Sequence, residues 1–294
     1  MAKHPPSKKT FVYERSLEMF NESWQTVLNK LPEYPDSYLH LGCTETDRVF
    51  GYQFLGGLDK ETLTHYLYLM HQTAIAHYRF VTSEGKRIKF TIDHKTFETE
   101  GQFTPDNFRF YYWLRHLCVA VLLKDQAAIQ RLCKIDKLWF RKVPMGNNVF
   151  DDALMDMIIG VFTGDKNLKQ HVMAVMKTSD QKNLTDTEAK FAYNILMPFS
   201  ELLTMAITKV DEATYQKAWL NAVKSHKEYW SSNKRLSEEH NGWISFPITA
   251  VSSLIYDQKG FKLPKQSPYV PEWLVYGDFE LQPSVGEDFF EGEI

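Results

Sequence analysis

The chain has 294 residues, of which 44% are hydrophobic and 14% are aromatic, and its formal net charge is −3. This composition excludes a disordered, a collagen-like and a disulfide-stapled chain. The length allows one large domain or two small ones.

No segment of the sequence has the pattern of a membrane span or of a secretory signal. The longest uninterrupted apolar run extends from Leu117 to Leu123, whereas a membrane helix needs about 20 apolar residues. The basic N-terminus has no apolar core. Cys43, Cys118 and Cys133 lack the spacing of a zinc site or a redox pair, and free thiols suit a reducing compartment. We therefore expect a cytoplasmic protein that does not contact a membrane.

The first strong helix signal is Asp59, which can cap a helix over KETLTHYLYLMHQTAIAHYRF, with Glu61 in the first turn. The next stretch, GKRIKFTIDHKTFETEG, is different because apolar and polar residues alternate in it and glycines bracket it. A period of two predicts a short β-hairpin near residues 86–100.

Helical signals then resume. Thr104-Pro105-Asp106 combines a capping hydroxyl, a proline and an acid, and predicts the start of a helix that continues through FRFYYWLRHLCVAVLL. Asp125 can cap a second helix over AAIQRLCKI, so that the two form a helical hairpin. We expect Trp113, Cys118 and Leu122 to share a buried face of the first helix.

Two further helical regions follow. Thr185 and Glu188 have the spacing of a capping box before AKFAYNILMPFSELLTMAI, in which Pro198 should kink or split the helix. Between Asp211 and Trp230, apolar residues recur at three- and four-residue spacing, which predicts a helix with one buried stripe. The members of this stripe are Tyr215, Trp219, Ala222, Val223, His226 and Trp230.

These signals predict an all-α or nearly all-α fold of packed helical hairpins with one small β-hairpin insertion. No linker-like segment divides the chain, so we expect a single helical domain over residues 11–280. Residues 1–10 are predicted to be a flexible basic N-terminus, and residues 281–294 an acidic-aromatic tail.

Residues that could carry catalysis form no recognisable pattern. Successive members of the series His65, His71 and His77 point about 240° apart around a helix, so they cannot share one ion. Asp152 and Asp156 share a helix face, but no nearby residue in the sequence completes a metal site. Phosphate-loop, zinc-protease and serine-hydrolase motifs are missing from the sequence. We predict no catalytic residue, no metal site and no cofactor.

The C-terminal region has an unusual charge distribution. All 34 lysines and arginines lie at or before Lys265, and the seven acids that follow it leave residues 1–265 with a formal charge of +4. Aromatic residues alternate with these acids, which disfavours nucleic acid as a partner and favours a basic protein. The predicted partner-binding residues are Tyr269, Trp273, Tyr276, Asp278, Glu280, Glu287, Asp288, Phe289, Phe290, Glu291 and Glu293. In the alternative, the rings up to Phe279 dock on the helical core and only an acidic tail follows.

The stretch GWISFPITAVSSLIYDQKGFKLPKQSPYVPEWLV resembles the C-terminal signature of the bacterial immunity protein 49 family. The matching residues are Gly242, Pro247, Tyr256, Asp257, Gly260, Ser267, Tyr269 and Pro271. The blocks WLRHLCVAVLLKDQAAIQRLCKID, IIGVFTGDKNL and HKEYW resemble further parts of the family in the same order, so that the resemblance covers about residues 20–280. The Asp-Arg-Gly-like motif of the family is Tyr-Asp-Gln-Lys-Gly here, and Pro268 follows Ser267.

The resemblance implies an immunity protein of a polymorphic toxin system, of the kind used in interbacterial competition through routes such as type VI secretion. Such a protein would bind a cognate toxin stoichiometrically and neutralise it in the cytoplasm. The acidic surface favours a basic toxin such as a nuclease. Two alternatives stay open at this point, a helical adaptor or scaffold without a toxin and an enzyme with a dispersed site. The identity of the toxin and the oligomeric state are not indicated by the sequence.

Overall fold

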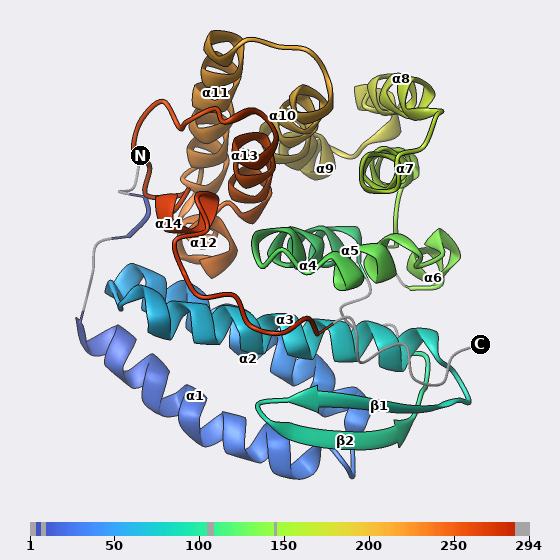
Figure 1. The fold of residues 1–294 in the computed structure, drawn as a ribbon, viewed down its shortest axis with the longest axis vertical. Coiled ribbons are helices and arrows are strands. Elements are labelled where there is room, and N and C mark those ends of the chain that lie inside the picture. The colour runs from blue at the N-terminus through green and yellow to red at the C-terminus, as the bar shows by residue number, and fades with distance from the viewer. Residues whose placement is uncertain (1–3, 7–9, 105–108, 144–145, 286–294) are drawn as a thin grey trace.

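The computed structural model describes residues 4–6, 10–104, 109–143 and 146–285. Its helices form two layers (Figure 1). The first layer contains α1 (Thr10–Lys30), α2 (Pro35–Gly56), α3 (Lys60–Thr82) and a hairpin of β1 (Arg87–Ile92) and β2 (Lys95–Glu100). The second layer contains α4 (Phe110–Leu122), α5 (Gln126–Cys133), α6 (Lys137–Arg141), α7 (Val149–Thr163), α8 (Leu168–Thr178), α9 (Asp186–Phe191), α10 (Met197–Ile207), α11 (Glu212–Trp230), α12 (Lys234–Glu238), α13 (Phe246–Lys259) and α14 (Glu272–Val275). The prediction of a mostly helical fold is confirmed.

The hairpin packs on α3 with one face. Phe90 lies opposite Phe97 in the antiparallel register, and their stacked ring centroids are 5.7 Å apart. Ile88 and Ile92 are buried on the same face, as the alternating pattern predicts. The prediction of a hairpin near residues 86–100 is confirmed.

Helix caps account for most of the element boundaries. Asp59 accepts a hydrogen bond from the Thr62 backbone N–H at 2.8 Å, and Asp125 accepts one from Ala128 at 3.0 Å. α4 ends at Leu122, and α5 begins at Gln126 and packs against it, so the predicted helical hairpin is confirmed. The predicted start of α4 at Thr104 is wrong, because Arg109 has extended backbone angles (φ −124°, ψ 149°) and the helix begins at Phe110. Pro105 and Asp106 lie outside the described residues.

One hydrophobic core runs through both layers. Trp113 and Trp219 are fully buried, and the Trp219 indole N–H donates to the Ser252 hydroxyl of α13 at 3.1 Å. The stripe on α11 is buried except for Val223, which is partly buried. Before Pro198 a π-helical turn over Ala192–Leu196 separates α9 from α10, because proline has no N–H for the regular α-helical ladder. The predicted split is confirmed.

The chain returns to the first layer at its C-terminal end. Gly260 ends α13 in the left-handed conformation (φ 71°), which favours glycine. An extended link leads to α14, and residues 277–285 then lie across α3 (Figure 1, red). We call residues 277–285 the C-terminal strap. In the described part of the chain, none of the helices combines the length and the apolar character that crossing a bilayer requires.

Candidate functional site

The polypeptide after α13 is attached to the helical core by aromatic contacts. The Tyr276 ring meets the Tyr256 ring edge-on with centroids 4.8 Å apart, and the Tyr276 hydroxyl accepts a hydrogen bond from the Leu263 backbone N–H at 3.2 Å. The Ser245 backbone N–H donates to the Tyr269 carbonyl at 2.9 Å. These contacts fix α14 and its flanking turns against both ends of α13.

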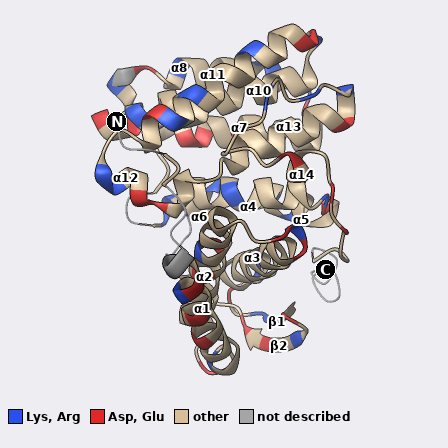
Figure 2. Cartoon of the chain, turned by 90° about the vertical axis from the view of Figure 1, so that its left-hand side faces the viewer, with Lys and Arg blue, Asp and Glu red and all other residues tan. Residues whose placement is uncertain are grey.

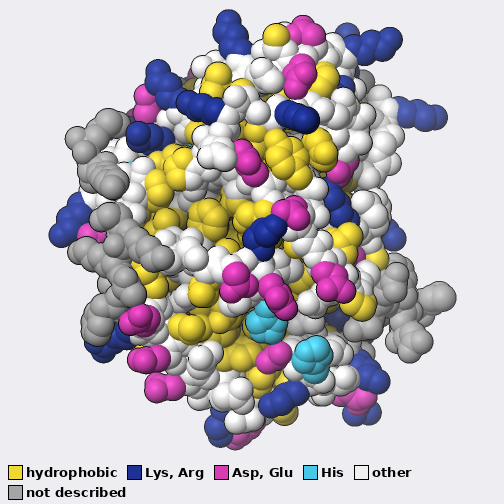
Figure 3. Space-filling model, turned by 60° about the vertical axis from the view of Figure 1, so that its left-hand side comes forward, with side chains coloured by type: hydrophobic (Ala, Val, Ile, Leu, Met, Phe, Trp, Pro, Cys, Tyr) yellow, Lys and Arg dark blue, Asp and Glu magenta, His cyan; other side chains and the backbone are white. Residues whose placement is uncertain are grey.

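A shallow groove of about 660 Å³ lies on this side of the molecule, and we call it the C-terminal groove. Its lining residues come from the start of α3 and from the region around α14: Lys60, Gln266, Ser267, Pro268, Val270, Glu272, Trp273, Tyr276 and Asp278. Three predicted partner-binding residues, Trp273, Tyr276 and Asp278, therefore share one groove. In Figure 3 the molecule is turned so that the side with α14 comes forward. Hydrophobic side chains gather in the middle of this face, and charged side chains lie around them.

Tyr269, another predicted partner-binding residue, does not line the groove and is buried. Its side chain is only 2% exposed, and its hydroxyl donates to the His4 carbonyl at 2.7 Å. Its ring also meets the His226 ring edge-on at 5.0 Å. Because the ring is enclosed, burial raises the pKa of Tyr269 above its usual value. Tyr269 therefore packs in the interior, and His4 of the N-terminal stretch packs with it.

The remaining predicted partner-binding residues come after Asp278 in the sequence. Glu280 is exposed on the strap. The strap is held by the backbone N–H of Gln282, which donates to the Tyr68 hydroxyl at 2.5 Å, and by Ser284, whose hydroxyl donates to Asp125 at 2.6 Å. Glu287, Asp288, Phe289, Phe290, Glu291 and Glu293 lie outside the described residues.

Acidic side chains also gather at a place that the sequence analysis missed. Glu14, Glu18 and Glu22 are exposed along one side of α1, and Figure 2 shows acidic residues over the first layer. Residues four apart lie on the same helix face, so the spacing of these three glutamates could have predicted an acidic face from the sequence. Basic residues are spread mainly over the helices of the second layer (Figure 2).

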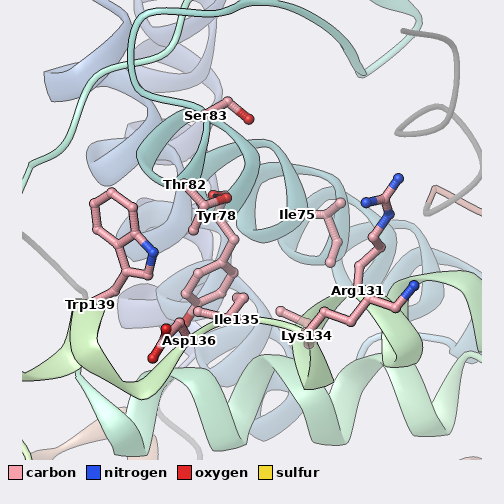
Figure 4. Close-up of a pocket in the computed structure, with 10 residues that line it drawn as sticks. Ile75, Tyr78, Thr82, Ser83, Arg131, Lys134, Ile135, Asp136 and Trp139 are labelled. Atoms are coloured by element: carbon pink, nitrogen blue, oxygen red, sulfur yellow. Dashed lines mark hydrogen bonds between the residues drawn. The ribbon is translucent and has the colours of Figure 1, made fainter. Parts of the chain in front are cut away.

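A narrower cavity of about 230 Å³ lies between α3, α5 and the connection to α6 (Figure 4). Arg131 and Lys134 lie at one end of it, and Asp136 and Trp139 lie at the other. Asp136 has a structural role, because its carboxylate accepts the Leu138 backbone N–H at 2.9 Å and caps α6. The cavity suits a small molecule or a single side chain better than the surface of a folded protein.

A third hollow, of about 180 Å³, contains two carboxylates near the starts of α7 and α9. Burial, reinforced by the charge of Glu188, raises the pKa of Asp151 to about 6. Shifted carboxyl groups in hollows are typical of enzymes. Here, however, Asp151 accepts the Asn148 backbone N–H at 3.2 Å, and the Asn148 side chain donates to Glu188 at 3.0 Å. Both carboxylates therefore have roles in capping helices.

The buried titratable groups also have structural partners. His71 contacts Asp125 at 3.0 Å, and His226 contacts the Gly242 carbonyl at 2.9 Å. Burial lowers the pKa of His116 and of His226 to about 3, so both rings are neutral near pH 7. Across the described residues, no group of three or more histidines, cysteines and acids is arranged to hold a metal ion.

The three cysteines are buried free thiols. Burial raises the pKa of Cys43 and of Cys133 to about 12, and it also raises the pKa of Cys118. At neutral pH these thiols are protonated, and a protonated thiol is a poor nucleophile. They therefore behave as small apolar side chains of the core.

Comparison with known proteins assigns the family. The family model described as Immunity protein 49 matches residues 59–274, which is most of the chain. No curated protein and no solved structure matches the chain. The chain belongs to the Immunity protein 49 family, as its C-terminal sequence indicated.

Proposed function

We propose that this immunity-family protein binds a cognate bacterial toxin as a stoichiometric complex and neutralises it inside the cell. The family match carries the proposal, because immunity proteins are named for protecting a cell against a toxin. The match begins at Asp59 and ends at Leu274, so it includes one wall of the C-terminal groove at Lys60 and another at Trp273.

The C-terminal groove and strap are the proposed contact surface. Trp273 and Tyr276 are partly buried aromatic residues, which supply binding energy when a partner covers them. Asp278 and Glu280 are exposed acids beside these rings, and exposed acids attract and orient a basic partner. Residues 287–293 extend this acidic and aromatic composition. The combination favours a basic toxin, such as a nuclease with a cationic substrate groove.

Co-expression with the product of the adjacent upstream gene, after that product alone is shown to stop growth, tests the proposal. We expect the protein to restore growth and to co-purify with an inactivated form of the toxin in a fixed ratio. Growth that is not restored, with both proteins present at normal levels, would contradict the proposal.

The same experiment separates the two alternatives. Rescue without a stable complex would favour an enzyme that repairs the damage or modifies the toxin. Complexes with other cellular proteins, and no rescue, would favour an adaptor or a scaffold. An unrelated toxin of the same activity serves as the control, because stoichiometric immunity should not extend to it.

A further inference from the structure

The C-terminal groove is occupied by a cation that belongs to the protein itself. Lys60, the first residue of α3, forms an ion pair with Asp278 across 218 positions of sequence. The side chains are 51% and 68% exposed, respectively. An exposed ion pair is weak because water and salt screen it. The Lys60 ammonium group can therefore be replaced by another cation at little cost.

The groove contains a second carboxylate that Lys60 does not pair with and that another cation could reach. Glu272, in the first turn of α14, lines the same groove and makes no ion pair within the described residues. With Glu272 and Asp278 against Lys60, the groove has a net negative charge. Carboxylates accept paired hydrogen bonds from a guanidinium group in a geometry that an ammonium group cannot match.

Aromatic rings complete the groove. Trp273 and Tyr276 both line it, and the Trp273 ring is braced edge-on by Phe279 with centroids 5.7 Å apart. Indole is the aromatic ring that attracts a cation most strongly, and a planar guanidinium group can stack on it. Pro268 and Val270 add apolar surface for the aliphatic part of a long side chain.

We propose that the C-terminal groove binds an arginine side chain of the toxin, between Glu272 and Asp278 and against Trp273, and that Lys60 occupies this place in the free protein. This inference rests on the proposed function and adds the chemistry of the partner. Binding exchanges one cation for another at Asp278, so Lys60 acts as an internal competitor of the toxin.

The test measures the dissociation constant of the complex with the inactivated toxin by titration calorimetry. Trp273→Ala and the pair Glu272→Gln with Asp278→Asn should each weaken binding at least about 10-fold. Lys60→Met should tighten binding by about threefold, because it removes the competing cation while keeping a long side chain. This opposite sign distinguishes the proposal from a general loss of structure.

Two matched variants serve as controls. Lys262→Met removes an exposed lysine near the groove, and Asp257→Asn removes an exposed acid on α13 that pairs with Lys124. Neither residue lines the groove, so both variants should bind like the wild type.

The outcomes separate the two proposals. If the wild type neither rescues growth nor binds the toxin, the proposed function fails and the arginine site fails with it. If the wild type rescues and binds but the groove variants bind equally well, only the arginine site is wrong. Weaker binding by Lys60→Met would also overturn it, since Lys60 would then be a contact and not a competitor.

Discussion

The carboxylate of Asp125 accepts a hydrogen bond from the backbone N–H of Val285 at 2.8 Å, although 160 positions separate the two residues. The same carboxylate caps α5 and contacts His71 on α3 at 3.0 Å. One side chain therefore joins the start of a helix in the second layer, a helix of the first layer and the C-terminal strap.

Asp125→Ala should lower the free energy of unfolding by about 2–4 kcal/mol. The change removes a helix cap and also the partner of buried polar groups, which then remain unsatisfied. Urea denaturation gives the value. Asp211→Ala is the control, because Asp211 also caps a helix through a backbone N–H, that of Thr214, but is exposed. An equal loss in both variants would mean that Asp125 acts only as a cap.

Trp219→Ala should lower the free energy of unfolding by about 3–5 kcal/mol, the range for truncating a large buried aromatic residue. The Trp219 side chain is fully buried, so the change leaves a cavity and removes the hydrogen bond that the Ser252 hydroxyl accepts from the indole. The control is Leu220→Ala on the same helix, where the side chain is 38% exposed and the loss should stay below about 0.5 kcal/mol. A loss below about 1 kcal/mol for Trp219→Ala would contradict the packing of α11.

Local features of the fold could be predicted because neighbouring residues determine them. Asp59, Asp125 and Thr185 accept hydrogen bonds from backbone groups three residues away, so their capping roles follow from composition and spacing. The alternation around Phe90 and the stripe that includes Trp219 likewise repeat within one element. The predicted start of α4 at Thr104 was wrong, because the backbone is extended at Arg109 and the helix begins only after it.

The site could be predicted only in part, because its walls come from distant segments. The mixture of acids and rings pointed to Trp273, Tyr276 and Asp278. The same composition also pointed to Tyr269, which is buried in contact with His226 and with His4 from the other end of the chain. Lys60 carried no sequence signal of its own, since only the path of the chain after α14 brings Asp278 to the start of α3.

The free energy of unfolding of Asp151→Asn should increase relative to that of the wild type as the pH rises. The pKa of the Asp151 carboxyl is about 6 in the folded protein and 3.8 as an ordinary value. The folded state favours the neutral form of this carboxyl. The wild type therefore has its full stability from this group below about pH 4 and loses this contribution as the pH rises through 6. The variant carries no charge, so its gain between pH 4 and 8 should approach about 3 kcal/mol.

Urea denaturation of both proteins at several pH values measures this gain. Asp156→Asn, on the same helix, is the control, since the Asp156 carboxylate pairs with Lys137 at 2.5 Å and its neutralisation should bring no gain above pH 6. A constant difference between Asp151→Asn and the wild type across this range would show that Asp151 is not shifted.

The last prediction concerns the acids after the strap. Changing Glu287, Asp288, Glu291 and Glu293 to their amides should slow association with the toxin about 10-fold at low salt and flatten its salt dependence. Exposed charges near an interface act mainly on the rate of encounter, and salt screens them. Stopped-flow measurements at several ionic strengths give both quantities, and circular dichroism should show an unchanged fold.

A change in total charge alone could imitate this result, so a matched variant is needed. Glu14, Glu18, Glu22 and Glu33 are exposed on α1 and just after it, and their replacement by glutamine removes the same number of charges from the first layer. If the acidic tail steers the toxin, the α1 variant should associate at close to the wild-type rate. Equal slowing in both variants would indicate an effect of net charge. An unchanged rate for the tail variant would place the toxin contact on the helical body. The exposed glutamates of α1, Glu14, Glu18 and Glu22, would then be the next surface to test.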